Sequence, residues 1–216
     1  QKMKEQGAKK LVFDLRDNPG GLLNEAIAIA NIFIPKDKEI VSTKGKVSEW
    51  NKTYMSLDAP IDTEMPIIVL TSGRSASASE IVAGALQDLD RAVIIGSRSF
   101  GKGLVQQQFR LSNGGALRLT TAKYYSPLGR NIQRSYANGK LAYEHDFYNR
   151  LNADAMGTPD SAQKGKAYKT PKGHIVYGGG GIYPDQWMPI HGIYSDSNYI
   201  KIWEQDVLLV LSDERS

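Results

Sequence analysis

The sequence predicts an α/β fold with a core of parallel strands. Short, wholly apolar runs of strand length recur along the chain. Between them lie segments whose apolar residues repeat at helical spacing. The chain has 216 residues, which is enough for one well-buried domain with or without appendages.

Three apolar runs predict buried strands, at residues 11–15, 66–71 and 92–96. A further short strand is predicted at 40–43. Apolar residues at helical spacing follow the first run from 26 to 34, where Pro35 ends the helix. They follow the second run from 78 to 89. Strands that alternate with helices in this order are typical of parallel pairing.

The second half of the chain is more polar. Residues 104–111 and 116–125 alternate like half-exposed strands, and Ser112-Asn113-Gly114-Gly115 between them predicts a hairpin. Residues 135–173 are rich in Gly, Asn, Lys and Asp, which predicts an excursion with little core of its own. Apolar spacing from 199 to 211 predicts a closing helix.

Composition excludes several classes of protein. The 27 basic and 23 acidic residues leave a net charge of +4, and the basic residues are dispersed, so nucleic-acid binding is not indicated. The absence of cysteine excludes thiol nucleophiles, thiolate metal sites and disulfides. No apolar run approaches the ~20 residues that span a bilayer. The polar start at Gln1 carries no signal peptide, and we expect a fragment or a processed form.

A serine and a lysine form the strongest candidate for chemistry. Ser77 lies directly before a predicted helix, and Lys102 lies between two glycines and close to apolar residues. A serine hydroxyl needs a base, and a lysine can be that base only when neutral, a form that desolvation favours. We therefore expect Lys102 in a backbone-lined, partly apolar pocket. All three histidines fall in the last third of the chain, so the pattern favours a Ser-Lys over a Ser-His-Asp hydrolase.

Local sequence leaves alternatives open. Ser72, Ser75 and Ser79 compete with Ser77 as helix caps, and Lys102 has the ordinary alternative of a solvated loop lysine. Glu80, in the first helical turn, is commonly a partner of the helix dipole.

Weaker candidates are assigned ordinary structural roles. Residues 178–181 lack the lysine of a phosphate loop and predict a turn between strands. Glu144-His145-Asp146 lacks a second, regularly spaced histidine and predicts a surface cluster rather than a metal site.

Three motifs in order carry a family resemblance. They are Asp14-Leu15-Arg16-Asp17-Asn18-Pro19-Gly20-Gly21, the run from Ser75 to Leu86, and Phe100-Gly101-Lys102-Gly103-Leu104-Val105-Gln106. Together they resemble the carboxyl-terminal processing peptidases, also called tail-specific proteases, which are Ser-Lys dyad enzymes. The likeness continues through residues 119–130 and, more loosely, 179–185.

The resemblance implies roles for five residues. It makes Ser77 the nucleophile and Lys102 the base, with Gln106 helping to hold the lysine. It also implies that the N–H groups of Gly21 and Ala78 bind the oxyanion. Glycine suits such a position because no Cβ obstructs the approach of the substrate.

The resemblance also implies an architecture. We expect a Clp-protease/crotonase-like core of strand-helix units around a mixed sheet, with a carboxyl-terminal extension. Residues 1–134 would form a protease core that is truncated at its amino end and lacks the family's PDZ domain. Residues 135–173 would form the polar excursion, and residues 174–216 would return to the core.

The function implied is that of a serine endopeptidase core domain that cleaves proteins near their carboxyl termini without a metal or organic cofactor. Its partners would be proteins or peptides with exposed carboxyl termini, and not nucleic acid. Membrane association would occur only through segments outside this chain. Formation of a homo-oligomer is left as an open possibility. The expected location is the bacterial periplasm or cell envelope. The alternatives are a truncated inactive fragment and a non-cleaving peptide-binding module that uses the exposed strand at 116–125. A crotonase-like acyl-transfer enzyme is disfavoured.

Overall fold

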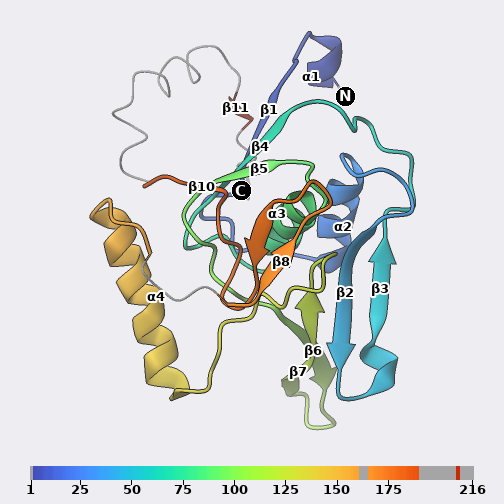
Figure 1. Ribbon diagram of the computed structural model, residues 1–216. Helices are drawn as coiled ribbons and strands as arrows, with labels where there is room; N and C mark the ends of the chain where they lie inside the picture. The colour runs from blue at the N-terminus through green and yellow to red at the C-terminus, as the bar shows by residue number, and fades with distance from the viewer. Residues whose placement is uncertain (1, 161–164, 190–207, 210–216) are drawn as a thin grey trace.

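The computed structural model describes residues 2–160, 165–189 and 208–209. Two sheets flank a central buried helix, and a long helix lies along one side (Figure 1). The α/β fold predicted from the sequence is confirmed. The elements are α1 (Lys2–Glu5), β1 (Leu11–Asp14), α2 (Leu23–Asn31), β2 (Glu39–Gly45), a 3₁₀ turn (Ser48–Trp50), β3 (Lys52–Met55), β4 (Ile67–Thr71), α3 (Ala78–Asp88), β5 (Val93–Gly96), β6 (Leu104–Arg110), β7 (Ala116–Tyr125), α4 (Gly139–Ala155), β8 (Ala167–Lys169), β9 (Ile175–Tyr177), β10 (Gln186–Trp187) and β11 (Leu208–Leu209).

The first sheet is parallel and has the strand order β10-β5-β4-β1-β11. Strands β1 and β4 pair in register from Leu11 with Ile67 to Asp14 with Leu70. The carboxyl ends of neighbouring parallel strands lie at the same edge of a sheet. The turn after β1 and the serine-rich loop after β4 are therefore neighbours.

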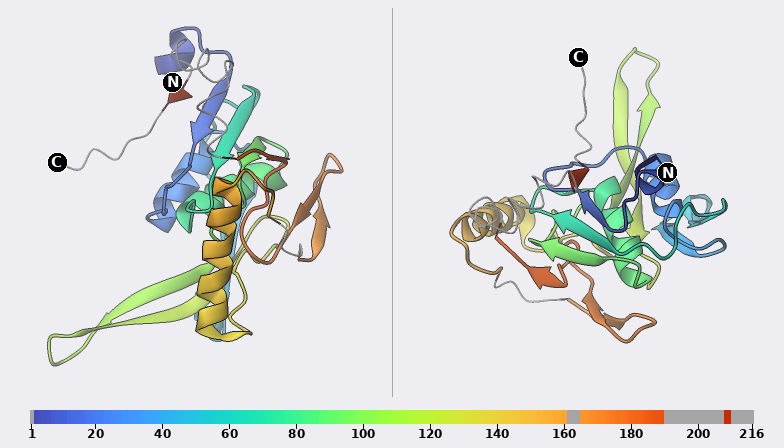
Figure 2. Two further views of the ribbon diagram at one scale, coloured as in Figure 1. Left: turned by 90° about the vertical axis from the view of Figure 1, so that its left-hand side faces the viewer. Right: turned by 90° about the horizontal axis from the view of Figure 1, so that it is seen from above.

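The second sheet is antiparallel, with the order β3-β2-β7-β6. The outer part of the β6–β7 hairpin projects well beyond the body of the molecule (Figure 2). Strand β7 is a free edge along only part of its length, because residues 122–125 pair with β2 on one side and residues 116–123 pair with β6 on the other. Only its outer half could accept an added strand.

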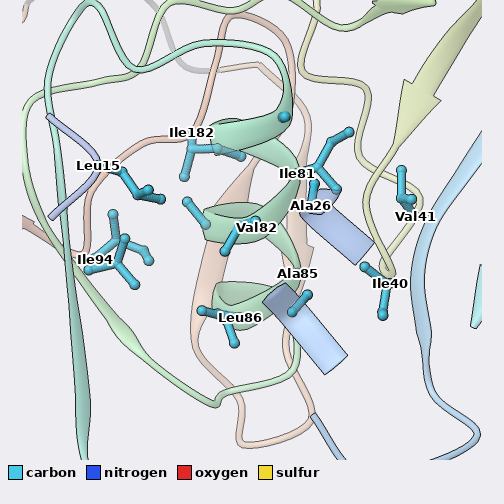
Figure 3. Close-up of a cluster of buried hydrophobic side chains, with 14 of the residues drawn as sticks. Leu15, Ala26, Ile40, Val41, Ile81, Val82, Ala85, Leu86, Ile94 and Ile182 are labelled. Atoms are coloured by element: carbon cyan, nitrogen blue, oxygen red, sulfur yellow. The ribbon is translucent and has the colours of Figure 1, made fainter. Parts of the chain in front are cut away.

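Helix α3 is the centre of the core. All eleven of its residues are buried. Leu15 and Ile94 approach it from the parallel sheet, and Ile40 and Val41 approach from the antiparallel sheet (Figure 3). Since both faces of α3 are covered, its two ends are held firmly, and the first of those ends begins directly after Ser77.

The carboxyl-terminal third differs most from the sequence prediction. The polar excursion at 135–173 contains the 17-residue helix α4, whose weak amphipathic pattern gave no helical signal. The helix predicted at 199–211 is wrong at Leu208 and Leu209, which form a strand beside β1. Its other residues, and His191, lie outside the described residues. Within the described ranges no helix is both long and apolar enough to cross a bilayer.

Candidate active site

The serine-rich loop after β4 is fastened to the turn after β1 by three buried serines. Their hydroxyl groups bond to groups of the first motif and so have structural roles. The contacts are Asp17 N–H to Ser72 Oγ (2.9 Å), Ser75 Oγ to the Leu15 carbonyl (2.6 Å) and Ser79 Oγ to the Asn18 carbonyl (3.1 Å). Ser77, the fourth serine of this segment, is half-buried. Its role as the nucleophile stays a prediction.

Ser77 stands at the amino terminus of α3 in an unusual backbone conformation. Its φ is 55° and its ψ is −114°. A positive φ is uncommon for a residue with a Cβ, and such conformations typically cost ~1–3 kcal/mol. The packing around α3 maintains this strain. The arrangement is a sharp strand-to-helix turn that holds a serine at its apex, in the manner of a nucleophile elbow.

The glycines of the first motif lie against this turn. Gly20 has a φ of 87°, and a Cβ there would lie 2.5 Å from the Ala76 carbonyl oxygen and 2.6 Å from the Ala78 nitrogen. Only glycine can approach so closely. Gly21, the next residue, is exposed, with open space where its side chain would be. The two N–H groups expected to bind an oxyanion, those of Gly21 and Ala78, therefore belong to adjoining segments of backbone.

Glu80 connects the second and third motifs. Its side chain is 1% exposed, and its carboxylate accepts four hydrogen bonds. Oε2 accepts from the backbone N–H groups of both Ser77 and Lys102, each at 2.9 Å. Oε1 accepts from the Gly101 N–H (2.6 Å) and the Ser99 hydroxyl (2.5 Å). One buried oxygen thus ties the backbone of the candidate nucleophile to that of the candidate base.

The charge of this carboxyl group matters for that connection. Burial raises the pKa of Glu80 above its ordinary value, and the hydrogen bonds from Ser99, Lys102, Gly101 and Ser77 partly offset the effect. A protonated carboxyl donates at one oxygen and can no longer accept all four bonds. Acidification through this raised pKa should therefore loosen the segment that holds Lys102.

We expect Glu80→Gln to lower peptide cleavage by about 100-fold, because the amide NH₂ would face N–H donors and displace Ser77 or Lys102. The measurement is kcat/KM, with circular dichroism to check folding. Glu64→Gln, at an exposed glutamate before β4, controls for the loss of one carboxylate and should leave cleavage unchanged. A Glu80→Gln variant that is folded and fully active would show that the connection is dispensable.

Lys102 itself is exposed. The expectation of a partly apolar pocket around it is wrong for the chain alone, because its side chain is exposed; of its apolar neighbours in sequence, Val105 packs against the core. Gln106 lies on β6 and is also exposed. Its side chain makes no hydrogen bond to Lys102 in the part of the chain that the structure describes, so its role in holding the lysine stays a prediction.

A bidentate ion pair stiffens the first motif. Arg16 donates from Nε to Asp14 Oδ1 (3.0 Å) and from Nη2 to Asp14 Oδ2 (2.6 Å). The pair spans the point where β1 ends and the turn towards Gly20 begins. Side-on pairing of this kind fixes orientation as well as distance.

Sequence reasoning treated Glu80 only as a partner of the helix dipole, and it quoted Gly20 within the first motif without giving it a role. The spacing Ser77-x-x-Glu80 is that of a capping box, which could have indicated a carboxylate reaching back to the Ser77 N–H. Nothing local indicated that the same carboxylate would also hold Lys102, because 22 residues separate the two.

All five residues assigned by resemblance lie in the part of the chain that matches a known family. The sequence profile of peptidase family S41 matches residues 1–139. The chain belongs to peptidase family S41. This is a family of serine-type peptidases, and the resemblance to carboxyl-terminal processing peptidases is confirmed.

Two S41 relatives illustrate the likeness. The carboxy-terminal-processing protease of Bartonella bacilliformis is 55% identical over 125 residues, which cover 58% of this chain and 29% of that protein. The carboxyl-terminal-processing protease of a Picosynechococcus species is 42% identical over 132 residues, covering 61% and 31%. This chain therefore spans about three tenths of the length of these relatives.

Solved structures agree on the S41 fold. The photosystem II D1 C-terminal processing protease is 36% identical, with a TM-score of 0.56 over 61% of this chain and 34% of that one. A lipoprotein from Streptococcus agalactiae shares the fold at 19% identity, with a TM-score of 0.52 over 89% of this chain and 55% of that one. The predicted fold class is thus confirmed by comparison as well as by topology.

Proposed function

We propose that this chain carries the catalytic centre of a serine endopeptidase that cleaves proteins near their carboxyl termini with a Ser77–Lys102 dyad. The observation that carries the proposal is the Glu80 carboxylate, which bonds to the backbone N–H groups of both residues. The strained turn at Ser77 and membership of family S41 support it.

In the proposed reaction Ser77 Oγ attacks the carbonyl carbon of the scissile peptide bond, and Lys102 Nζ accepts the hydroxyl proton. The N–H groups of Gly21 and Ala78 stabilise the negative oxygen of the tetrahedral intermediate. Lys102 then returns the proton to the leaving amine. In the second half of the reaction a water molecule hydrolyses the ester between the acyl group and Ser77. The chemistry uses neither a metal nor an organic cofactor.

Because Lys102 is exposed, the bound substrate has to shield it from water before it can act as a base. Only a neutral amine can take a proton, and contact with water does not favour the neutral form. A peptide bound across Ser77 would cover Lys102 and exclude water from it, and such desolvation favours the neutral amine. Binding of the peptide and activation of the base are then one event.

The test is to identify the products of digestion. The chain is incubated with an unstructured protein, and the new termini are located by mass spectrometry. We expect cuts that gather towards the carboxyl end and none in the Ser77→Ala variant. Cuts spread evenly along the substrate would contradict the carboxyl-terminal preference. The same cuts in Ser77→Ala would contradict the dyad.

A peptide-binding module that does not cut is the second candidate, favoured by the free outer half of β7. In the same digestion it would leave the substrate intact and retain it. For location we propose the bacterial periplasm or cell envelope, on the strength of the resemblance to the carboxyl-terminal processing peptidases. Fractionation of the source cells tests that location, and recovery from the cytoplasm alone would contradict it.

A further inference from the structure

Helix α4 packs against residues 97–100, the segment that leads from β5 to Lys102. All of α4 except its first residue lies beyond the match to family S41, which ends at residue 139. The Ser97 hydroxyl donates to Asp154 on this helix, and the rings of Phe100 and Phe147 pack with their centroids 4.9 Å apart. The contact that bears on the candidate active site comes from Arg150.

Arg150 is a buried cation whose guanidinium binds backbone carbonyls. The residue is 7% exposed. Its Nη1 donates to the Ser99 carbonyl (2.9 Å) and its Nη2 to the Phe100 carbonyl (3.2 Å). Burial and the nearby Arg98 lower the pKa of Arg150 to about 10, and the Asp146 carboxylate opposes this change. Arg150 is therefore charged near neutral pH, and hydrogen bonds from a charged donor are stronger than those between neutral groups.

The peptide group between Phe100 and Gly101 is held at both ends. Its carbonyl accepts from Arg150, and its N–H, which belongs to Gly101, donates to Glu80 Oε1 at 2.6 Å. Because the group joins a buried cation to a buried carboxyl group, a rotation of its plane would break hydrogen bonds on both sides. Lys102 is the next residue, and its own N–H donates to Glu80 Oε2 at 2.9 Å.

The backbone at Gly101 offers little resistance of its own to such a rotation. Its φ is 87°, and glycine adopts positive and negative φ about equally readily. A Cβ here would lie 2.5 Å from Arg134 Cγ and 2.9 Å from the Gly180 carbonyl carbon, so no residue with a side chain could stiffen the position. The direction in which the Lys102 side chain leaves the body consequently depends on the bonds to this peptide group.

We infer that Arg150 is a positioning residue for the candidate base, and that it acts from α4 through the Phe100–Gly101 peptide group to fix the orientation of Lys102. The inference rests on the proposed function for the role of Lys102 as the base. A displacement of about 1 Å in a reacting group can cost about 100-fold in rate. A cation that touches neither substrate nor nucleophile can therefore affect the reaction.

Amide hydrogen exchange, measured by NMR, tests the inference without catalysis. Arg150→Met keeps a side chain of similar width and removes the charge and both donors. We expect the N–H groups of Gly101 and Lys102 to exchange at least tenfold faster, while those in the middle of α3 keep their wild-type rates. If this variant does not fold, Arg150→Gln decides by the same threshold. Unchanged exchange at both N–H groups would overturn the inference.

Arg91→Met is the matched control for the loss of a buried guanidinium. Arg91 also donates to backbone carbonyls, those of Phe33 (2.9 Å) and Met65 (2.7 Å), and burial lowers its pKa as well. It follows α3 at the end remote from the candidate nucleophile. The control should lose stability and leave the two N–H groups at their wild-type exchange rates. Equal acceleration in Arg91→Met and Arg150→Met would show a general loosening and overturn the inference.

A double-mutant cycle tests whether Arg150 acts together with Glu80. The measurement is the rate at which a fluorophosphonate labels Ser77, a reaction that needs an activated hydroxyl group but no peptide. Arg150→Met should slow labelling at least tenfold, and Arg150→Lys, which keeps the charge, should recover part of the loss. In a Glu80→Gln background Arg150→Met should slow labelling by less than threefold, because the peptide group has already lost its acceptor. Fully independent losses would overturn the inference.

The two measurements separate this inference from the proposed function. If the wild-type chain is not labelled at Ser77, the proposed function fails, and the exchange rates still decide whether Arg150 fixes the segment that carries Lys102. If the wild-type chain is labelled and Arg150→Met changes neither the labelling nor the exchange rates, the proposed function stands and the inference is overturned.

Discussion

The Ser77→Ala variant is expected to lose peptide cleavage by about four orders of magnitude or more while keeping its fold. Removing Oγ removes the atom that attacks the carbonyl. No neighbouring serine can substitute, because the hydroxyl groups of Ser72, Ser75 and Ser79 are buried and bonded to the first motif. The strained backbone at Ser77 accepts alanine as readily as serine, so stability should change little. The measurement is kcat/KM on a fluorogenic peptide.

Ser79→Ala is the matched control. It deletes a hydroxyl two residues away that donates to the Asn18 carbonyl at 3.1 Å. The loss of one partly buried hydrogen bond costs ~1 kcal/mol of stability. We expect residual activity well above that of Ser77→Ala. Full activity in Ser77→Ala, or equal loss in both variants, would refute the assignment of the nucleophile.

The Lys102→Arg variant is expected to be as inactive as Lys102→Ala. Arginine keeps the positive charge and nearly the same reach, yet it cannot give up its proton at any pH near neutrality because its pKa lies far above that range. The exchange therefore separates a base from a residue that merely supplies charge. Since Lys102 is exposed and its backbone is fixed by Glu80, the variant should fold normally. The measurement is again kcat/KM, with thermal unfolding as the check on structure.

Lys123→Arg is the control, because Lys123 is an exposed lysine on β7 that pairs with Leu104 beside the site. It should cleave at the wild-type rate. Wild-type activity in Lys102→Arg would mean that the base lies elsewhere. His174 is badly placed for that role, since it bonds to Asp90 beyond the far end of α3. Eleven helical residues, ~16 Å, separate that end from Ser77.

The elements that sequence predicted well are those whose burial is strong and local. Strands β1, β4 and β5 are largely apolar runs of four or five residues. Such runs are too short for a typical helix, so a buried strand is the structure they favour. Helix α3 showed a clear apolar face. Helix α4 was missed because it packs through arginines and aromatic rings, such as Arg150 donating to the carbonyls of Ser99 and Phe100, and not through an aliphatic stripe.

In the candidate site, too, sequence predicts the features that depend on local pattern and misses those that depend on long-range contacts. The position of Ser77 before a helix follows from local pattern, and its neighbourhood with Gly20 follows from parallel pairing of β1 with β4. The exposure of Lys102 and the four bonds to Glu80 depend on how the segment after β5 folds back over α3. That path is set by long-range contacts, which no local pattern reports.

The central claim, that Ser77 is a nucleophile activated by Lys102, is tested most directly by covalent labelling. A fluorophosphonate reacts with activated serine hydroxyl groups, and mass spectrometry of the digested chain locates the adduct. We expect a single adduct on Ser77, formed at least 100-fold more slowly in Lys102→Arg and at the wild-type rate in Lys123→Arg. An adduct on Ser72, Ser75 or Ser79, or labelling of Ser77 that is equally fast in Lys102→Arg, would contradict it.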